Sequence, residues 1–142
     1  MDVNVLELKT IFEPDQAVID AVDNGLETYN FSKVGGWTCD HLAIIAEDNK
    51  EKIIGGLYGV IQWDWLEIEL AWVDETYRSK GLGSKLVSEA EAAAVSKGVQ
   101  NVHLRTGSWQ AVDFYKKLGY AVFGQLEDYP KGFTTYFMRK SL

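Results

Sequence analysis

The chain contains little cysteine, histidine or proline, and each shortage excludes a class of protein. Its 142 residues include one cysteine, two histidines and two prolines. A single cysteine allows no internal disulfide and no thiolate metal cluster, and Cys39, His41 and His103 follow no metal-ligand spacing, so we expect no metal site. We expect Cys39 to be a small buried residue rather than a nucleophile activated by His41.

Positive charge and long apolar runs are also scarce. The formal net charge is −7, whereas nucleic-acid and anionic-membrane surfaces need a broad basic face. The stretch MDVNVLELKTIFE carries charges throughout, unlike a signal peptide, and the run IIGGLYGVIQW is too short to span a bilayer. We therefore expect a cytoplasmic protein that binds neither nucleic acid nor membrane. The negative charge is compatible with a cationic small molecule as partner.

The hydrophobic pattern predicts an α+β fold. No linker or repeat divides the chain, and 46% of its residues are hydrophobic, so we expect one domain over residues 1–142. Its helices should cover a mixed seven-stranded sheet in an α/β/α sandwich. Strands are expected at residues 3–10, 41–48, 52–62, 65–73, 99–106, 120–127 and 134–140, and helices at residues 14–30, 82–97 and 109–119. An exposed edge at residues 134–140 would suit a homodimer.

A glycine-rich basic turn, RSKGLGSK at residues 78–85, leads directly into the second helix. The unpaired amide groups at the start of a helix favour a phosphate, and Arg78, Lys80 and Lys85 place positive charge around them. The Walker pattern GxxxxGK(S/T) does not fit, because the upstream Gly and the Gly-Lys order are missing. The dinucleotide pattern GxGxxG does not fit either, because Leu86 stands at its third glycine.

The remaining pattern, Arg78-x-x-Gly81-x-Gly83, resembles the acetyl-CoA signature (R/Q)xxGx(G/A) of the GNAT family of N-acetyltransferases. The segment AVDFYKKLGYAVFG is similar to that family's AxxFYxKxGF segment. The resemblance implies a GNAT-like fold, an acetyl-CoA cosubstrate whose pyrophosphate lies in the turn, and a pantetheine arm beside the preceding strand. The residues that it places at the cosubstrate are Leu70, Ala71, Trp72, Val73, Arg78, Ser79, Lys80, Gly81, Leu82, Gly83 and Ser84. Many members have an Asn near the start of the segment after the strand that follows the second helix. In this chain Ser108, Trp109 or Gln110 would have to make any contact with the pantetheine there, and we expect Ser108 at the cosubstrate.

Acyl transfer to an amine needs a base, because an aliphatic ammonium has a pKa of about 10. Glu67 and Glu69 have the period-two spacing that places both on one face of a strand, and either could take the proton. Trp63 and Trp65 beside them would suit a cationic or ring-bearing acceptor.

The leaving thiolate needs an acid. The resemblance implies Tyr115, although Tyr115 also belongs to an apolar helical stripe and could be a core residue.

These residues predict an N-acetyltransferase that acts on a primary amine, with a small molecule as the expected acceptor. Protein N-termini or lysines are alternative acceptors. A non-catalytic acyl-CoA-binding module, or a structural protein without a ligand, would also account for the fold.

Overall fold

The computed structural model describes residue 2 and residues 6–142, which cluster in two compact units, Met1–Gly36 and Trp37–Leu142. The single domain expected over residues 1–142 stays a prediction. All of the predicted site residues belong to the second unit.

The first unit contains helix α1, Gln16–Val34. Asp15 caps it, with its side chain accepting a hydrogen bond from the Val18 amide at 3.1 Å, and Gly35 ends it with a φ of 77°. The strand expected at residues 3–10 is wrong for residues 6–10, which belong to no helix or strand, while residues 3–5 lie outside the described residues. An alternating pattern is typical of a strand, but it forms one only where a second strand pairs with it.

The second unit contains a mixed sheet with the order β1-β2-β3-β4-β6-β5. Its strands are β1 (Cys39–Glu47), β2 (Ile53–Gln62), β3 (Trp65–Val73), β4 (Asn101–Gly107), β5 (Ala121–Glu127) and β6 (Thr134–Ser141). Only β3 and β4 pair in parallel. The α+β class is therefore confirmed, with six strands in the described residues instead of seven.

Two details differ from the sequence predictions. The strand β6 lies between β4 and β5, so the edge expected at residues 134–140 is wrong, and the edges are β1 and β5. Cys39 is exposed, not buried, because it begins an edge strand. His41 shares a 2.6 Å hydrogen bond with the Tyr58 hydroxyl through its Nδ1 atom.

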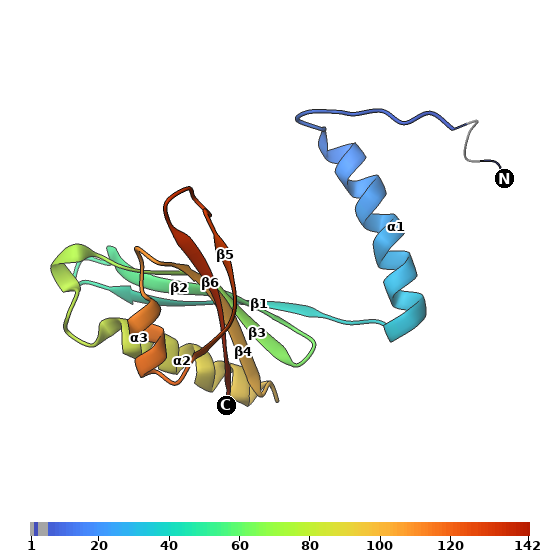
Figure 1. The fold of residues 1–142 in the computed structure, drawn as a ribbon. Helices are drawn as coiled ribbons and strands as arrows, with labels where there is room; N and C mark the ends of the chain where they lie inside the picture. Colours follow the sequence, from blue (N-terminus) through green and yellow to red (C-terminus); the bar gives the residue numbers. More distant parts are fainter. Residues whose placement is uncertain (1, 3–5) are drawn as a thin grey trace. The chain divides into compact units, whose positions relative to one another are not determined.

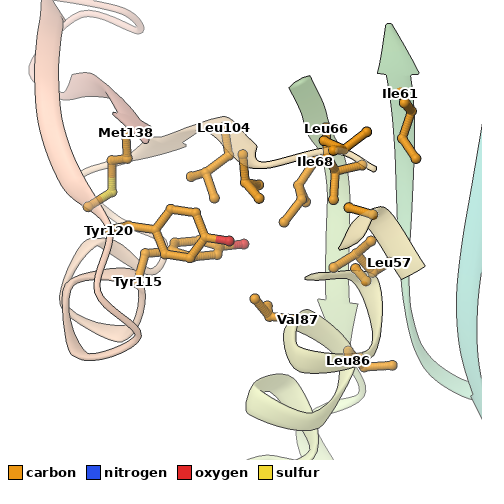
Figure 2. Packing of buried hydrophobic residues seen from close by; sticks show 14 residues of the cluster. Leu57, Ile61, Leu66, Ile68, Leu86, Val87, Leu104, Tyr115, Tyr120 and Met138 are labelled. Atoms are coloured by element: carbon orange, nitrogen blue, oxygen red, sulfur yellow. The ribbon is translucent and has the colours of Figure 1, made fainter. Parts of the chain in front are cut away.

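Helices α2 (Leu82–Ser96) and α3 (Val112–Lys117) lie on the same side of the sheet (Figure 1). The core forms between them and the strands (Figure 2). Its largest fully buried side chains are Leu66 from β3, Met138 from β6, Val87 from α2 and Val102 from β4. A short 3-10 helix, η2 (Glu75–Tyr77), connects β3 to the turn before α2.

The first half of β3 is an ordinary buried strand. From Trp65 opposite Asn101 to Ile68 opposite Leu104, it pairs in parallel with β4, and its other side pairs with β2. Leu66 is fully buried and Ile68 is 4% exposed. This half fixes the position of β3 against the core.

The second half of β3 separates from β4. The parallel ladder stops after Ile68, and a bulge in the pairing with β2 leaves Glu69 without a partner, since Gly59 lies opposite Ile68 but Tyr58 opposite Leu70. The bulge ends the inward and outward alternation, and Leu70 is 67% exposed. Backbone groups of residues 69–72 on the β4 side are therefore free to meet a ligand, whereas the Val73 carbonyl accepts a hydrogen bond from Arg78.

Candidate active site

The turn before α2 presents unpaired amide groups. Gly81, with a φ of 80°, is the N-cap residue, and no side chain caps the helix. The first intrahelical bond runs from the Lys85 amide to the Gly81 carbonyl at 3.2 Å. The amides of Leu82, Gly83 and Ser84 meet no acceptor among the described residues, so this end of α2 suits an anion.

The two glycines of the turn have different functions in the fold. The positive φ of Gly81 favours glycine, because residues with a Cβ rarely adopt it. A Cβ at this position would meet nothing within 4 Å. A Cβ at Gly83 would lie 3.2 Å from Cζ of Phe114. Gly83 therefore lets α3 approach α2, while the space at Gly81 stays open.

A cavity of about 550 Å³ opens in front of this turn, and we call it the turn cavity. Arg78 lines it, and the Nε atom of Arg78 donates a 2.9 Å hydrogen bond to the Val73 carbonyl, which fastens the turn to the end of β3. The predicted cosubstrate residues in its wall are Ala71, Trp72, Val73, Arg78, Ser79, Gly81, Leu82, Gly83 and Ser84. Sequence reasoning missed Tyr77, Phe114 and Lys117, which also line it.

A second cavity of about 510 Å³ occupies the gap between the separated parts of β3 and β4, and we call it the gap cavity. It shares Ala71, Trp72, Val73, Arg78, Ala111 and Tyr115 with the turn cavity. Leu70, another residue predicted for the cosubstrate, lines the gap cavity but not the turn cavity. An elongated ligand held by the α2 amides could therefore continue along the free backbone of β3.

A third cavity of about 400 Å³, the outer cavity, adjoins the gap cavity. The two share Glu69, Arg105, Thr106, Trp109 and Gln110. The wall is completed by Gly107, Tyr129, Pro130 and Thr135. The three cavities thus follow one another from the start of α2 to the loop between β5 and β6.

The two glutamates differ in their access to these cavities. Glu69, the bulge residue, lines both the gap and outer cavities. Glu67 lies in the paired half of β3, between Val60 and His103, and lines none of the three. Of the two glutamates that the sequence placed on one face, Glu69 alone therefore reaches these cavities.

Tyr115 combines the two possibilities that the sequence left open. It is 6% exposed and belongs to the core, and burial raises the pKa of its hydroxyl. Yet its hydroxyl has no hydrogen-bond partner among the described residues. Every fully buried polar side-chain atom of the described residues has a partner, so the Tyr115 hydroxyl is not fully buried. The hydroxyl therefore has access to space at the cavities that Tyr115 lines, the turn and gap cavities.

Figure 2 shows the rings of Tyr115 and Tyr120 side by side, with both hydroxyl oxygens pointing the same way, and their centroids are 5.6 Å apart. The hydroxyl of Tyr120 donates to Glu91 at 3.4 Å. Burial, followed by the nearby Glu91 charge, raises the pKa of Tyr120. Of the two tyrosines, Tyr115 has the hydroxyl that is available to a ligand.

Other predicted residues lie away from the cavities. Ser108 bonds with Thr134, its amide donating to the Thr134 carbonyl at 2.7 Å and its Oγ accepting from the Thr134 amide at 3.1 Å. Lys80 lies with its Nζ atom 5.8 Å from the centroid of the Tyr77 ring. Lys85 lines a separate cavity beside β1.

Trp63 and Trp65, the aromatic residues expected to suit the acceptor, line none of the three cavities. Trp63 packs on Trp37 and Trp65 on His103, at 5.5 Å and 5.6 Å between ring centroids. Trp109 and Tyr129 supply the aromatic wall of the outer cavity instead. No sequence signal pointed to Tyr129, because its loop approaches Thr135 and Trp109 only in the folded chain.

In the described part of the chain, no helix is long and apolar enough to cross a membrane. The same residues hold no group of three or more His, Cys, Asp or Glu side chains that could bind a metal ion.

The sequence profile of the "Acetyltransferase (GNAT) family" matches residues 7–120 of this chain. Blasticidin-S acetyltransferase from Streptomyces morookaense is 39% identical over 101 residues, which cover 70% of this chain and 74% of that protein. Thialysine N-epsilon-acetyltransferase from Sus scrofa is 36% identical over 70 residues, covering 45% of this chain and 41% of that protein.

An acetyltransferase from Bacillus cereus, solved at 1.9 Å, superposes with a TM-score of 0.87 at 34% identity, covering 94% of this chain and 98% of its own. The chain belongs to the GNAT family of acetyltransferases. It is an N-acetyltransferase that uses acetyl-CoA, which confirms the class and the cosubstrate predicted from residues 78–83.

The cavities fit this cosubstrate chemically. The unpaired α2 amides, Arg78 and Lys117 offer donors and positive charge for phosphates at the turn cavity. The free backbone of β3 offers donors and acceptors for an amide-bearing arm.

Proposed function

We propose that this protein transfers the acetyl group of acetyl-CoA to the primary amine of a small molecule that enters through the outer cavity. The curated relatives named above support a small-molecule acceptor, since their names specify blasticidin S and thialysine. The three adjoining cavities support the route, because they let acceptor and thioester approach from opposite ends. A cytoplasmic location, predicted from the sequence, stays part of this proposal.

In this proposal Glu69 is the general base. The protonated acceptor amine loses one proton to the Glu69 carboxylate, directly or through a water molecule, and the neutral amine then attacks the thioester carbonyl. Glu67 is not assigned this step because it lines none of the three cavities. The bulge that sets Glu69 at the gap is the observation on which this assignment depends.

Tyr115 is the general acid in the proposal. When the carbon–sulfur bond breaks, the Tyr115 hydroxyl donates its proton to the departing thiolate. The acetylated nitrogen then gives its extra proton to the Tyr115 oxygen, which restores the hydroxyl, and the neutral amide product leaves through the outer cavity. The raised pKa of this hydroxyl keeps it protonated at neutral pH. Its lack of a protein partner leaves it free to donate.

Tyr115 and Glu69 both line the gap cavity, and this shared position is the observation that carries the proposal. An acid and a base that reach one cavity can serve the two ends of a single acyl transfer. The predicted cosubstrate residues that line the turn cavity, Arg78, Ser79 and residues 81–84, then bind and orient it without taking part in the proton transfers.

The test is a panel of small amines and lysine-containing peptides, with thiol release and the mass of the acetylated product as readouts. We expect acceptor-dependent thiol release with at least one small amine, and a rate at least tenfold lower for Tyr115→Phe. Turnover with peptides alone would move the acceptor class to proteins. Full activity of Tyr115→Phe would remove Tyr115 from the reaction and leave it a core residue.

A further inference from the structure

The outer and gap cavities share two residues of opposite charge, Glu69 and Arg105. Both are exposed. Neither side chain forms an ion pair or hydrogen bond with another described residue. The ion pair found among the described residues joins Lys140 to Glu91. An anion and a cation at one cavity are thus both available to a ligand.

The topology explains why these two residues lie at the same cavities. The last parallel pair of the β3–β4 ladder is Ile68 opposite Leu104, and Glu69 and Arg105 are the residues that follow it on each strand. Ile68 and Leu104 are both buried in the core, whereas Glu69 and Arg105 are exposed and line the same two cavities. Glu69 and Arg105 therefore flank the point where the strands part.

The rest of the outer cavity is suited to the apolar part of a small ligand. A Cβ at Gly107 would lie only 2.3 Å from the Trp109 ring, so glycine lets the ring lie against the backbone there. Trp109 also meets Phe133 edge-on, with 5.3 Å between ring centroids. The Thr135 hydroxyl donates a 2.6 Å hydrogen bond to the Tyr129 carbonyl, which fixes the facing loop. Trp109 and Tyr129 are about half exposed and form aromatic walls.

We infer that the acceptor is an amino acid or a similar zwitterion, whose carboxylate binds Arg105 while its amine faces Glu69. A planar guanidinium can donate two parallel hydrogen bonds to a carboxylate, and a carboxylate base attracts the ammonium before taking its proton. This inference rests on the proposed function and makes Arg105 a specificity-determining residue for it. An amine without a carboxylate would leave Arg105 without its partner and lose that contribution.

The test compares ω-amino acids of two to six carbons with their primary amides, which keep the amine and remove the negative charge. We expect kcat/KM for at least one acid to exceed that for its amide by about 10- to 100-fold. In Arg105→Gln this ratio should fall to about 1. Arg105→Lys, which keeps the charge without the planar fork, should give an intermediate ratio.

Arg139→Gln is the matched control, because Arg139 is an exposed arginine on β6 that lies over the Phe123 ring and lines none of the three cavities. It should keep the wild-type ratio. Equal use of acids and amides by the wild type, or an acid preference that survives in Arg105→Gln, would overturn the inference while the acetyl transfer itself stands.

A second readout separates this inference from the proposed function. If no amine in the series stimulates thiol release, calorimetric titration of the coenzyme A complex with the same acids measures the carboxylate site without turnover. Binding that weakens about tenfold or more in Arg105→Gln supports the site even then. Absent or Arg105-independent binding refutes it.

Discussion

The two halves of β3 belong to one nine-residue strand but contribute differently to the protein. Residues 65–68 pair on both sides and carry Leu66, a fully buried side chain. Residues 69–73 are separated from β4 and carry Leu70 with 67% of its surface exposed. One bulge marks the change, so a single strand provides both the fixed core and the open edge that a ligand needs.

The two glutamates make the sharpest test of this comparison. We expect Glu69→Gln to lower kcat by about 100- to 10,000-fold, because the amide cannot accept the proton of the acceptor amine. Glu67→Gln, the matched change two residues earlier in the paired half, should lower it less than threefold. Steady-state thiol release measures both, and a larger loss for Glu67→Gln would transfer the base to the paired half.

The paired half should dominate stability. Leu66→Ala is expected to lower the free energy of unfolding by about 2–5 kcal/mol, because it leaves a cavity in the core. Leu70→Ala should change it by less than about 0.5 kcal/mol, as for other exposed positions. Urea denaturation of the two variants gives both values, and similar losses would mean that the second half is packed as tightly as the first.

Arg78 links the separated half to the turn. Arg78→Ala removes the hydrogen bond to the Val73 carbonyl and a cation at the turn cavity. We expect affinity for acetyl-CoA to fall about tenfold or more, measured by calorimetry. Lys80→Ala, which changes a neighbouring cation outside the turn cavity, should have a smaller effect, and the reverse order would contradict the assignment.

The smallest expected effect is the pH dependence of stability from Tyr115. Burial raises the pKa of this hydroxyl in the folded chain, so above about pH 10 the unfolded chain loses its proton first. Stability is then fully present below pH 10 and falls as pH rises through the folded pKa. Tyr115→Phe should remove up to about 1.4 kcal/mol of this loss per pH unit.

Denaturation of the wild type and Tyr115→Phe at pH 9, 10 and 11 measures the difference between the two slopes. Tyr120 is present in both proteins, but the nearby Tyr115 contributes to raising its pKa, so the difference between the slopes reports the coupled pair. Parallel slopes would mean that the hydroxyl of Tyr115 titrates in the folded chain as it does in the unfolded one.

The sequence predicted the sheet of the second unit closely because its strands and helices have clear periods and glycine stops. It predicted the glycine turn that opens α2 because Arg78, Gly81 and Gly83 are local in the chain. The bulge at Glu69 was not predictable, since a two-residue alternation looks the same whether or not the partner strand skips a residue. Arg105 and Tyr129 were missed because only the separation of β3 from β4 and the fold of the β5–β6 loop place them at one cavity.

The crystal structure of the protein with coenzyme A tests the central claim most directly, namely that the open half of β3 receives the cosubstrate. We expect the diphosphate at the amides of Leu82, Gly83 and Ser84, and the pantetheine arm between residues 69–73 and 105–107. A ligand bound elsewhere, or a closed ladder between those two segments, would contradict the account.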